Sequence, residues 1–383
     1  MAGPLTGIKV LDLSRILSGP FCTALLADLG ADVVKIEKPP KGDLARNLGP
    51  QMKGDSAYFM SVNRGKRSVT ADIFTNDGAE LIKALAIKAD ILVENYTPGT
   101  MQDLGLGFAQ LEVLNKRLIY ASITGFGQSG PYSNKPALDA VVQAMGGLMS
   151  VTGEKEGPPL RPGVSLGDSL AGIFTALSIT SALHQRNVTG LGQHIDISML
   201  DCQVTLMENA FSRYFATHEV PQRLGSRHPS AAPFQSFATQ NGHIVIALLN
   251  DDPAQWEKIC NAVELSHLAV DERFVNNSKR VENRAQLEYE FDTSLSKNTT
   301  EYWMERLDKA NAPAAPVLDI DQVSKDPQVR FRNMISTIPH KNLGTWQVAN
   351  SPFNFSNAET GPAGPSPDLG EHTEEVLSEW LDN

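Results

Sequence analysis

The chain has 383 residues, of which 41% are hydrophobic and 20% charged, and its formal net charge is −11. This composition is typical of a soluble globular protein, and the length predicts more than one domain. The negative charge argues against nucleic acids and anionic membranes as partners, because both select a cationic face. We expect no membrane-spanning segment, since no apolar run approaches the roughly 20 residues required.

Cysteine and histidine are sparse and scattered along the chain. Cys22, Cys202 and Cys260 stand far apart, and the eight histidines form no metal-ligand spacing. This pattern predicts a reducing compartment, no disulfide framework and no metal site. The first residues enter a strand-like pattern directly, without the basic and apolar regions of a signal peptide. We therefore expect a cytoplasmic protein; a matrix enzyme that has lost its transit peptide remains an alternative.

Strands and helices alternate in the first part of the chain. We predict strands over 7–13, 31–37, 68–73, 90–94 and 118–123, and helices over 21–29 and 77–89. Strand, helix and strand at this spacing predict a parallel sheet of Rossmann type. The first strand-to-helix turn lacks the G-x-G-x-x-G motif, so an ordinary dinucleotide site is not expected.

The middle of the chain changes character. We predict helices over 138–147, 168–185 and 199–218, a strand over 193–198, and a further strand pair over 235–238 and 243–248. Charged and aromatic helical segments then continue to about residue 310. The predicted fold class is α/β: residues 1–220 form the first part of a large Rossmann-like domain, 221–318 a smaller α+β domain, and 319–383 a segment that completes the large domain.

The most informative short segment is Ser165-Leu166-Gly167-Asp168-Ser169. Taken alone, Asp168 is an N-cap residue for the helix that follows. A helix N-terminus also stabilises a carboxylate anion, and its free N–H groups can hold developing negative charge. Gly167 would allow close approach of another group. The segment therefore suits either a structural cap or a nucleophile.

Motifs along the whole chain resolve this ambiguity. In order they are Gly7-Ile8-x-Val10-Leu11-Asp12, Gly19-Pro20, LGADVVKIE (29–37), Asn63-x-x-Lys66-Arg67-Ser68, ADILVENYTPG (89–99), Gly125-Phe126-Gly127-x-x-Gly130-Pro131, GVSLGD (163–168) and Gly370-Glu371-His372-Thr373. From residue 5 to residue 378 the chain resembles the family III CoA-transferases, the CaiB/BaiF family. The resemblance implies acyl-CoA and small carboxylic acids as substrates, no tightly bound cofactor, and an interlocked, ring-like homodimer.

In that family the carboxylate at the position of Asp168 attacks the donor thioester and forms a mixed anhydride. The released CoA thiolate then converts the anhydride into an aspartyl-CoA thioester, which the acceptor acid attacks in turn. Each step exchanges one activated acyl bond for another, so neither ATP nor a metal is required. A carboxyl group with an ordinary pKa of about 3.9 is already ionised at neutral pH.

The resemblance also implies the CoA-binding residues. Ile16, Leu17 and Ser18 would border the adenine and pantetheine path, Lys38 would lie near the phosphates, and Ala71, Asn95, Tyr96 and Thr97 would line the nucleotide pocket. Core packing is the alternative for Ile16, Leu17 and Ala71, and a solvated surface position is the alternative for Lys38. Asp103 stands where relatives often carry an arginine, so that phosphate contact is not expected.

Two neighbouring residues bear on the reaction type. Asp139 matches an acidic position beside the active site of relatives; it either positions Asp168 or the substrate, or caps the helix 138–147. Leu138 stands where the racemase branch of the fold requires a histidine for two-base proton transfer. Leucine cannot move a proton, which favours CoA transfer over an α-methylacyl-CoA racemase. A catalytically silent CoA-binding protein is the third alternative.

The loop Gln222-Arg223-Leu224-Gly225-Ser226-Arg227-His228-Pro229 concentrates positive charge in an acidic chain. It is either a solvated surface loop or a mobile lid in which Arg227 and His228 contact a dicarboxylate, because guanidinium pairs well with carboxylate. The loop lacks the glycine run of formyl-CoA:oxalate transferases and is more similar to the acetyl-CoA:oxalate and succinyl-CoA:dicarboxylate branches. A small dicarboxylate such as oxalate is therefore the expected acid.

Overall fold

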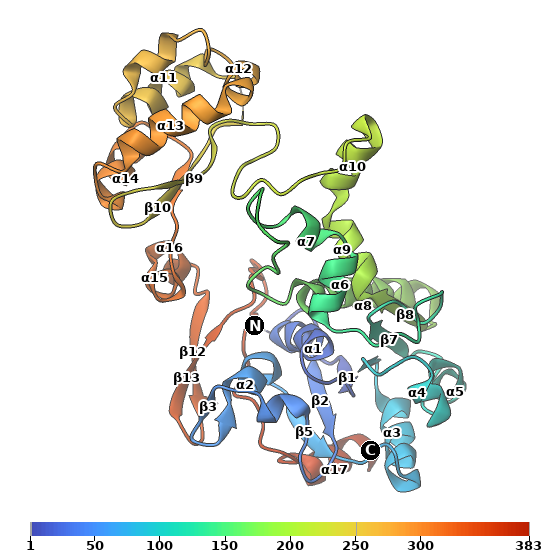
Figure 1. Cartoon of the computed structure of the whole chain (residues 1–383). Coiled ribbons are helices and arrows are strands. Elements are labelled where there is room, and N and C mark those ends of the chain that lie inside the picture. Colours follow the sequence, from blue (N-terminus) through green and yellow to red (C-terminus); the bar gives the residue numbers. More distant parts are fainter. Residues whose placement is uncertain (1, 250, 383) are drawn as a thin grey trace. The chain divides into compact units, whose positions relative to one another are not determined.

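A computed structural model describes residues 2–249 and 251–382, and Figure 1 follows the chain through them. The chain divides into two compact units. The first unit comprises the N-terminal residues up to Met149, the segment Arg161–Glu219 and the residues from Pro327 onward. The second unit comprises Ser150–Leu160 and Val220–Asp326. The chain therefore leaves the first unit and later returns to it.

Within the described residues, six parallel strands form the central sheet of the first unit, in the order β5-β2-β1-β6-β7-β8. They are β1 (Lys9–Asp12), β2 (Asp32–Glu37), β5 (Arg67–Thr70), β6 (Ile91–Glu94), β7 (Ile119–Thr124) and β8 (Gln193–Ser198). This is the doubly wound order in which the chain switches direction between β1 and β6, and such sheets bind ligands beyond the carboxyl ends of their strands at that point. The predicted strands and the parallel sheet are confirmed.

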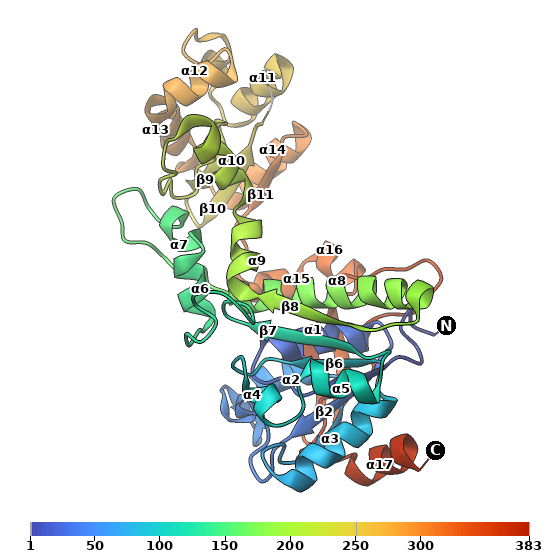
Figure 2. The same ribbon diagram turned by 90° about the vertical axis from the view of Figure 1, so that its right-hand side faces the viewer.

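Helices cover both faces of this sheet, with α1 and α8 on one face and α3 and α17 on the other (Figure 2). The helices of this unit are α1 (Ser18–Asp28), α2 (Ala57–Asn63), α3 (Asn76–Lys88), α4 (Thr100–Asp103), α5 (Phe108–Leu114), α6 (Asp139–Met145), α8 (Leu166–Thr189), α9 (Met199–Leu206), α10 (Glu208–Thr217), α16 (Pro327–Phe331) and α17 (Thr373–Leu381), and α7 (Leu148–Val151) spans the boundary between the units. The single helix predicted over 199–218 is thus divided into α9 and α10.

Strand side chains alternate between two hydrophobic cores. Val10 and Ile91 pack in the core that includes α1 and α8. Leu11 and Leu92, one position further along each strand, pack in the core that includes α3 and α17. Successive residues of a strand point to opposite faces, so both faces of this sheet are apolar and both are covered by helices.

Helix α8 corrects one expectation and bears on a second. Its N-cap is Ser165, so Asp168 is the third residue of the helix and not its cap. Among the described residues it is also the one helix whose length and mean hydropathy, 1.4, would suffice to cross a membrane. We had expected no such segment. Of the residues in that apolar window, 44% are buried inside the protein, and the helix packs against α1 and the sheet. A helix that packs in a protein core can have the same apolar composition as one that crosses a membrane.

The second unit has its own core. Its antiparallel sheet runs in the order β11-β10-β9, with Trp256, Phe291 and Trp303 buried beside it. Its elements are β9 (Phe234–Ala238), β10 (His243–Ala247), α11 (Pro253–Ala262), α12 (Asn277–Glu282), α13 (Arg284–Leu295), α14 (Thr300–Lys309), β11 (Ala314–Pro316) and α15 (Ile320–Lys325). The predicted strand pair is confirmed.

Two short hairpins complete the first unit. Strand β3 (Gln51–Met52) pairs with β4 (Asp55–Ser56), and β12 (Ile335–His340) pairs with β13 (Gly344–Ala349). Both pairs are antiparallel and lie outside the central sheet, so they do not alter its parallel topology.

Candidate active site

A cavity of about 240 Å³ lies at the carboxyl ends of β1, β6 and β7 and reaches the first turn of α8. This is the switch point of the sheet, where the fold predicts a ligand. The predicted site residues on its wall are Ile16, Leu17, Ser18, Asn95, Tyr96, Thr97 and Asp168. Segments far apart in the sequence therefore bring the predicted nucleophile and most of the predicted CoA-binding residues to one cavity. Leu138 lies on the same wall and adds no titratable group to it.

A neighbouring cavity of about 290 Å³ shares Arg15 and Tyr96 with the first and contains Lys38. The Lys38 ammonium pairs with Asp72 at 2.9 Å, and its side chain is 58% exposed. Lys38 therefore lies at a solvent-facing rim, where it is available to an anionic ligand. Sequence reasoning missed Arg15, although it lies in the same loop as Ile16.

Ala71 occupies a different environment. It is buried in the core on the α3 side of the sheet and is not on the wall of either cavity. The core-packing alternative therefore describes its surroundings.

The Asp168 carboxyl group has an unusual environment for an acid in the first turn of a helix. Burial, and then the negative charge of Asp139, raise its pKa to about 6, against the opposing effects of a hydrogen bond from Ser18 and the charge of Arg161. This corrects the expectation of an ordinary pKa. At neutral pH the group is still mostly ionised, and its higher basicity favours nucleophilic attack.

Asp139 ties the start of α6 to the start of α8. Its Oδ1 accepts the backbone N–H of Gly167 at 2.9 Å, and its carboxylate also accepts from Gln143 and from Arg161, at 2.7 Å. Asp139 is the first residue of α6, and the N-cap position belongs to Leu138. The helix-cap alternative is therefore wrong, whereas a role in positioning the first turn of α8 agrees with these contacts.

Gly167 is required by this packing. A Cβ at this position would come within 2.7 Å of Val142 Cγ2 and 3.1 Å of Asp139 Oδ1. A side chain would therefore push α6 away from Asp168. The close approach that Gly167 was predicted to allow is therefore made by side chains of α6.

Tyr58 on α2 is a further neighbour that sequence reasoning missed. Burial, and then the negative charges of Asp168, Asp43 and Asp139, raise its pKa to about 12. The phenol near Asp168 therefore stays protonated at neutral pH. No sequence motif connects residue 58 with residue 168, because only the fold brings them together.

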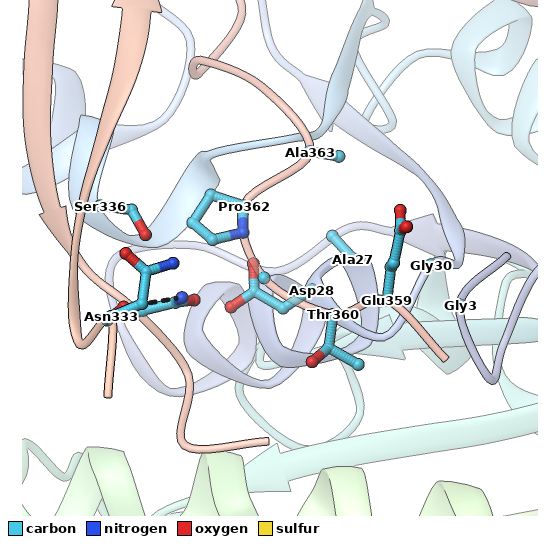
Figure 3. Close-up of a pocket in the computed structure, with 12 residues that line it drawn as sticks. Gly3, Ala27, Asp28, Gly30, Asn333, Ser336, Glu359, Thr360, Pro362 and Ala363 are labelled. Carbon is cyan, nitrogen blue, oxygen red and sulfur yellow. Dashed lines mark hydrogen bonds between the residues drawn. The ribbon is translucent and has the colours of Figure 1, made fainter. Parts of the chain in front are cut away.

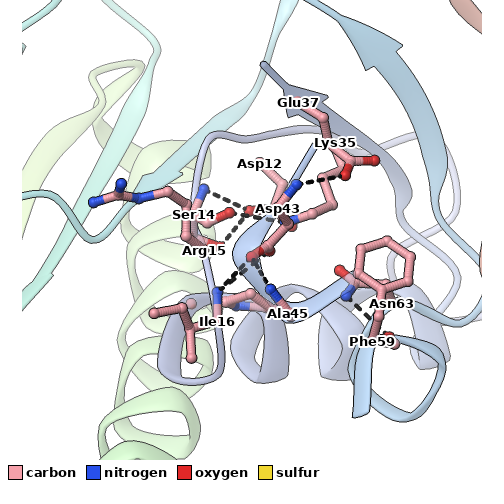
Figure 4. A network of polar contacts seen from close by, with 12 residues as sticks. Asp12, Ser14, Arg15, Ile16, Lys35, Glu37, Asp43, Ala45, Phe59 and Asn63 are labelled. Atoms are coloured by element: carbon pink, nitrogen blue, oxygen red, sulfur yellow. Dashed lines mark hydrogen bonds and ion pairs between the residues drawn. The ribbon is translucent and has the colours of Figure 1, made fainter. Parts of the chain in front are cut away.

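The loop after β1 is held in a strained conformation by a buried polar network (Figure 4). Ile16 has a φ of +68°, which is rare for a β-branched residue and costs about 1–3 kcal/mol. Its N–H donates to both carboxylate oxygens of Asp43, at 3.1 and 3.2 Å. Asp43 pairs with the fully buried Lys35, whose ammonium also donates to the Ser14 carbonyl at 2.8 Å. The cavity wall is thus fixed before a ligand binds.

A second buried cluster underlies the Asn63-x-x-Lys66 motif. Lys66 Nζ donates to Asp12 at 3.0 Å, to Asn63 at 2.9 Å and to the Pro20 carbonyl at 3.0 Å. Asp12 also accepts from the Thr23 hydroxyl at 2.6 Å. Burial lowers the pKa of Lys66 to about 8. The motif therefore anchors α1 to the end of β1 and is structural.

A larger cavity of about 370 Å³ lies elsewhere in this unit, between the N-terminal segment and residues 333–363 (Figure 3). Its buried carboxylate, Asp28, pairs with Arg64 at 2.5 Å. None of the predicted site residues lines this cavity. Among the described residues, no group of three His, Cys, Asp or Glu side chains is arranged to hold a metal ion.

Arg227 and His228 belong to the second unit. The Arg227 guanidinium forms two hydrogen bonds to Glu288 on α13, at 2.6 and 3.0 Å. The His228 ring stacks on Phe234 with ring centres 4.7 Å apart. Both side chains therefore have partners within their own unit, and their role in a substrate lid stays a prediction.

Comparison with known proteins gives consistent results. Residues 5–373 match the model of CoA-transferase family III. The chain is 41% identical to the acetyl-CoA:oxalate CoA-transferase of Acetobacter aceti, over 87% of this chain and 85% of that protein. It is 36% identical to the human succinyl-CoA:glutarate CoA-transferase, over 99% of this chain and 86% of that protein.

The fold is also found among solved structures. A CaiB/BaiF family protein from Brucella suis superposes with a TM-score of 0.90 at 38% sequence identity. The superposition covers 99% of this chain and all of that protein, so both units have counterparts there.

Proposed function

Because the chain belongs to CoA-transferase family III and is a CoA-transferase, we propose that it moves CoA from an acyl-CoA to a small dicarboxylic acid through Asp168. The observation that carries this proposal is the Asp168 carboxylate itself. It lies on the wall of the switch-point cavity, mostly ionised at neutral pH, with its basicity raised by burial and by Asp139. Such a group is suited to attack a thioester.

The proposed chemistry balances without a co-reactant. An Asp168 oxygen attacks the thioester carbonyl and the C–S bond breaks, which gives a mixed anhydride and CoA thiolate. The thiolate attacks the Asp168 carboxyl carbon and releases the donor acid, which leaves an aspartyl-CoA thioester. The acceptor carboxylate attacks that carbon and displaces the CoA thiolate, which gives a second mixed anhydride. The thiolate then attacks the acceptor carbonyl of this anhydride, which forms the new acyl-CoA and frees the Asp168 carboxylate.

The two adjoining cavities suit the shape and charge of CoA. Arg15 and Tyr96 line both, so the cavities adjoin, and we infer that CoA would extend from the exposed rim at Lys38 toward Asp168. The cationic side chains along this path are Arg15, Lys38, Lys41 and Lys135. Their positive charge locally opposes the net charge of −11 and would pair with the phosphates of CoA. Asp168 would then lie at the thiol end of CoA.

The proposed acid class rests on the relatives, whose names include oxalate and glutarate, both dicarboxylates. We expect the second carboxylate to be bound by a cation, and the loop 222–229 remains our candidate for it. The direct test is a matrix of acyl-CoA donors and carboxylic acids, with the products identified by mass. Exchange with monocarboxylates alone would contradict the dicarboxylate proposal.

We also propose a homodimer. Helices α8 and α10 expose large apolar side chains: Leu177 is 59% exposed, Val188 80% and Phe215 67%. Apolar surface of this kind is commonly covered by a partner. Light scattering should give twice the mass of the 41.5 kDa chain, and a monomeric mass at micromolar concentration would refute the dimer.

A further inference from the structure

Ser18 is a buried polar residue on the wall of the candidate active-site cavity. It is the first residue of α1, is only 4% exposed, and lies on the wall of the cavity that contains Asp168. It shares this wall with the Asp168 carboxylate and lies close enough to lower the pKa of that group, although burial and Asp139 raise it by more. A carboxylate accepts and cannot donate, so in the ionised state the Ser18 hydroxyl is the donor.

Asn95 orients this hydroxyl. Its Nδ2 donates to Ser18 Oγ at 3.3 Å, so the oxygen acts as an acceptor there and its own proton is left for Asp168. The amide is itself fixed from both ends by Arg15: Oδ1 accepts the Arg15 N–H at 2.8 Å, and Nδ2 donates to the Arg15 carbonyl at 2.8 Å. Asn95 is therefore placed to orient Ser18, and it also lies on the cavity wall, where lining the nucleotide pocket stays a prediction.

The distance between Ser18 and Asp168 is set by the packing of α1 on α8. A Cβ on Gly172, one turn beyond Asp168, would lie 2.8 Å from the Ser18 carbonyl oxygen and 3.2 Å from the Cys22 nitrogen. The absence of a side chain at residue 172 therefore lets the two helix starts approach closely. The donor and the carboxylate are thus held by rigid elements and not by a mobile loop.

We propose that Ser18 is a catalytic residue: its hydroxyl donates to one oxygen of Asp168 and stays on that oxygen while the other is acylated. The proposal rests on the proposed function, in which Asp168 is the nucleophile. In the anhydride and the aspartyl-CoA thioester, this oxygen is the Asp168 carbonyl oxygen. When the thiolate or the acceptor acid attacks the Asp168 carboxyl carbon, negative charge develops on it, and a positioned donor stabilises that charge.

Other groups near Asp168 have different effects. Asp139, on α6, and Arg161, in the segment before α8, act on it through charge, and Tyr58, on α2, lies close enough to feel its charge. Arg161 is engaged by Asp139 and by the Ser165 hydroxyl. Removal of the Ser18 hydroxyl should therefore leave the charges around Asp168 unchanged. Its effect on the reaction can then be distinguished from the effects of those charges.

The test is Ser18→Ala, followed by single-turnover rates of both half-reactions and by the pH dependence of the first. We expect both rates to fall roughly 10²-fold, as for the loss of one oxyanion donor. We also expect the acidic limb of the pH profile to move to higher pH, because a donor that stabilised the carboxylate is gone. Ser18→Thr keeps a hydroxyl and should restore both properties.

Ser181→Ala is the matched control, because it removes a hydroxyl from α8 that donates to the Leu177 carbonyl of its own helix. Its rates and pH profile should equal those of the unmodified protein. If Ser18→Ala does not fold, Ser18→Cys keeps the side-chain volume with a weaker donor and should show the same changes. Wild-type rates and an unmoved acidic limb in the folded variant would overturn the role of Ser18.

Hydroxylamine trapping separates this outcome from a failure of the proposed function. In the unmodified protein, turnover with acyl-CoA should leave a hydroxamate on Asp168, located by peptide mass. CoA exchange without any adduct there would overturn the proposed nucleophile, and the role of Ser18 with it. An adduct that forms at equal rates with and without the Ser18 hydroxyl would overturn the role of Ser18 alone.

Discussion

Two carboxylates of the first unit, Asp12 at the end of β1 and Asp168 at the start of α8, differ in almost every respect. Asp12 is fully buried and accepts from Lys66, from the Ser14 backbone and from the Thr23 hydroxyl. Burial alone would raise its pKa, but Lys66 and Lys35, together with the hydrogen bonds from Ser14 and Thr23, hold the pKa below its usual range. Asp168 is only partly buried, lies beside another carboxylate, and has a pKa of about 6.

The difference shows how one unit can hold a structural acid beside the acid that we propose as the nucleophile. The lone pairs of Asp12 are saturated by donors, so its charge stabilises the fold and is unavailable for chemistry. Asp168 receives one hydroxyl donor and an unfavourable negative neighbour, so its charge is less stabilised and more basic. Substitutions around Asp12 should therefore lower the stability of the fold, whereas substitutions around Asp168 should lower activity.

The largest expected effect is on turnover. Asp168→Asn keeps the shape of the side chain but removes the proposed nucleophile, and CoA exchange should fall by at least roughly 10³-fold. Binding of CoA, measured by calorimetry, should persist. Asp77→Asn is the control, because Asp77 is an exposed acid in the first turn of α3. Equal loss of exchange in both variants, or loss of CoA binding in Asp168→Asn, would contradict the assignment.

The second effect is on folding. Lys66→Met removes the direct ion-pair partner of the buried Asp12 carboxylate, which should lower the free energy of unfolding by about 3–5 kcal/mol. Denaturant unfolding followed by circular dichroism measures this loss. Lys83→Met removes a lysine of the exposed pair with Glu80 and should cost no more than about 1 kcal/mol. A Lys66 variant as stable as the Lys83 variant would show that the Asp12 cluster does not stabilise the fold.

The third effect concerns Asp139, the charged neighbour of the proposed nucleophile. Asp139→Asn removes the charge that raises the pKa of Asp168, so the folded-state pKa should fall below about 6. The acidic limb of kcat/KM should then move to lower pH by about one unit, because the reactive form is the carboxylate. Asp201→Asn, an exposed change on α9, should leave the limb in place. A shift to higher pH would mean that the hydrogen bonds of Asp139 matter more than its charge.

Much of the fold was predictable, because the periodic apolar strands at 31–37 and 118–123 and their alternation with helices are local signals. The strands predicted there are confirmed as β2 and β7. The division of 199–218 into two helices at Met207 was not predictable from composition. Neither was the start of α8 at Leu166, two residues before the predicted start at Asp168, since no side chain caps this helix.

The site was only partly predictable. Motifs pointed to Asp168 and to the loop after β1, and the order of strands explains why these meet. Tyr58, Arg161 and the Ser18–Asn95 contact come from segments whose proximity depends on tertiary packing, so no spacing in the sequence reveals them. Asn95 illustrates the point, because an asparagine after a strand suits a ligand contact and a loop clamp equally well.

The smallest expected effect lies at the rim of the CoA path, where charge is exposed and hydrated. Lys38→Gln should raise the KM for acyl-CoA by about 2–5-fold with kcat unchanged, because an exposed cation contributes only modestly to binding. The increase should shrink as salt is added, since screening already weakens the contact. Lys53→Gln, an exposed lysine on the β3–β4 turn, is the matched control. A change in kcat without a change in KM would mean that Lys38 acts in the reaction at Asp168 and not in CoA binding. The proposed division between a binding residue at the rim and a reactive residue at Asp168 would then be wrong.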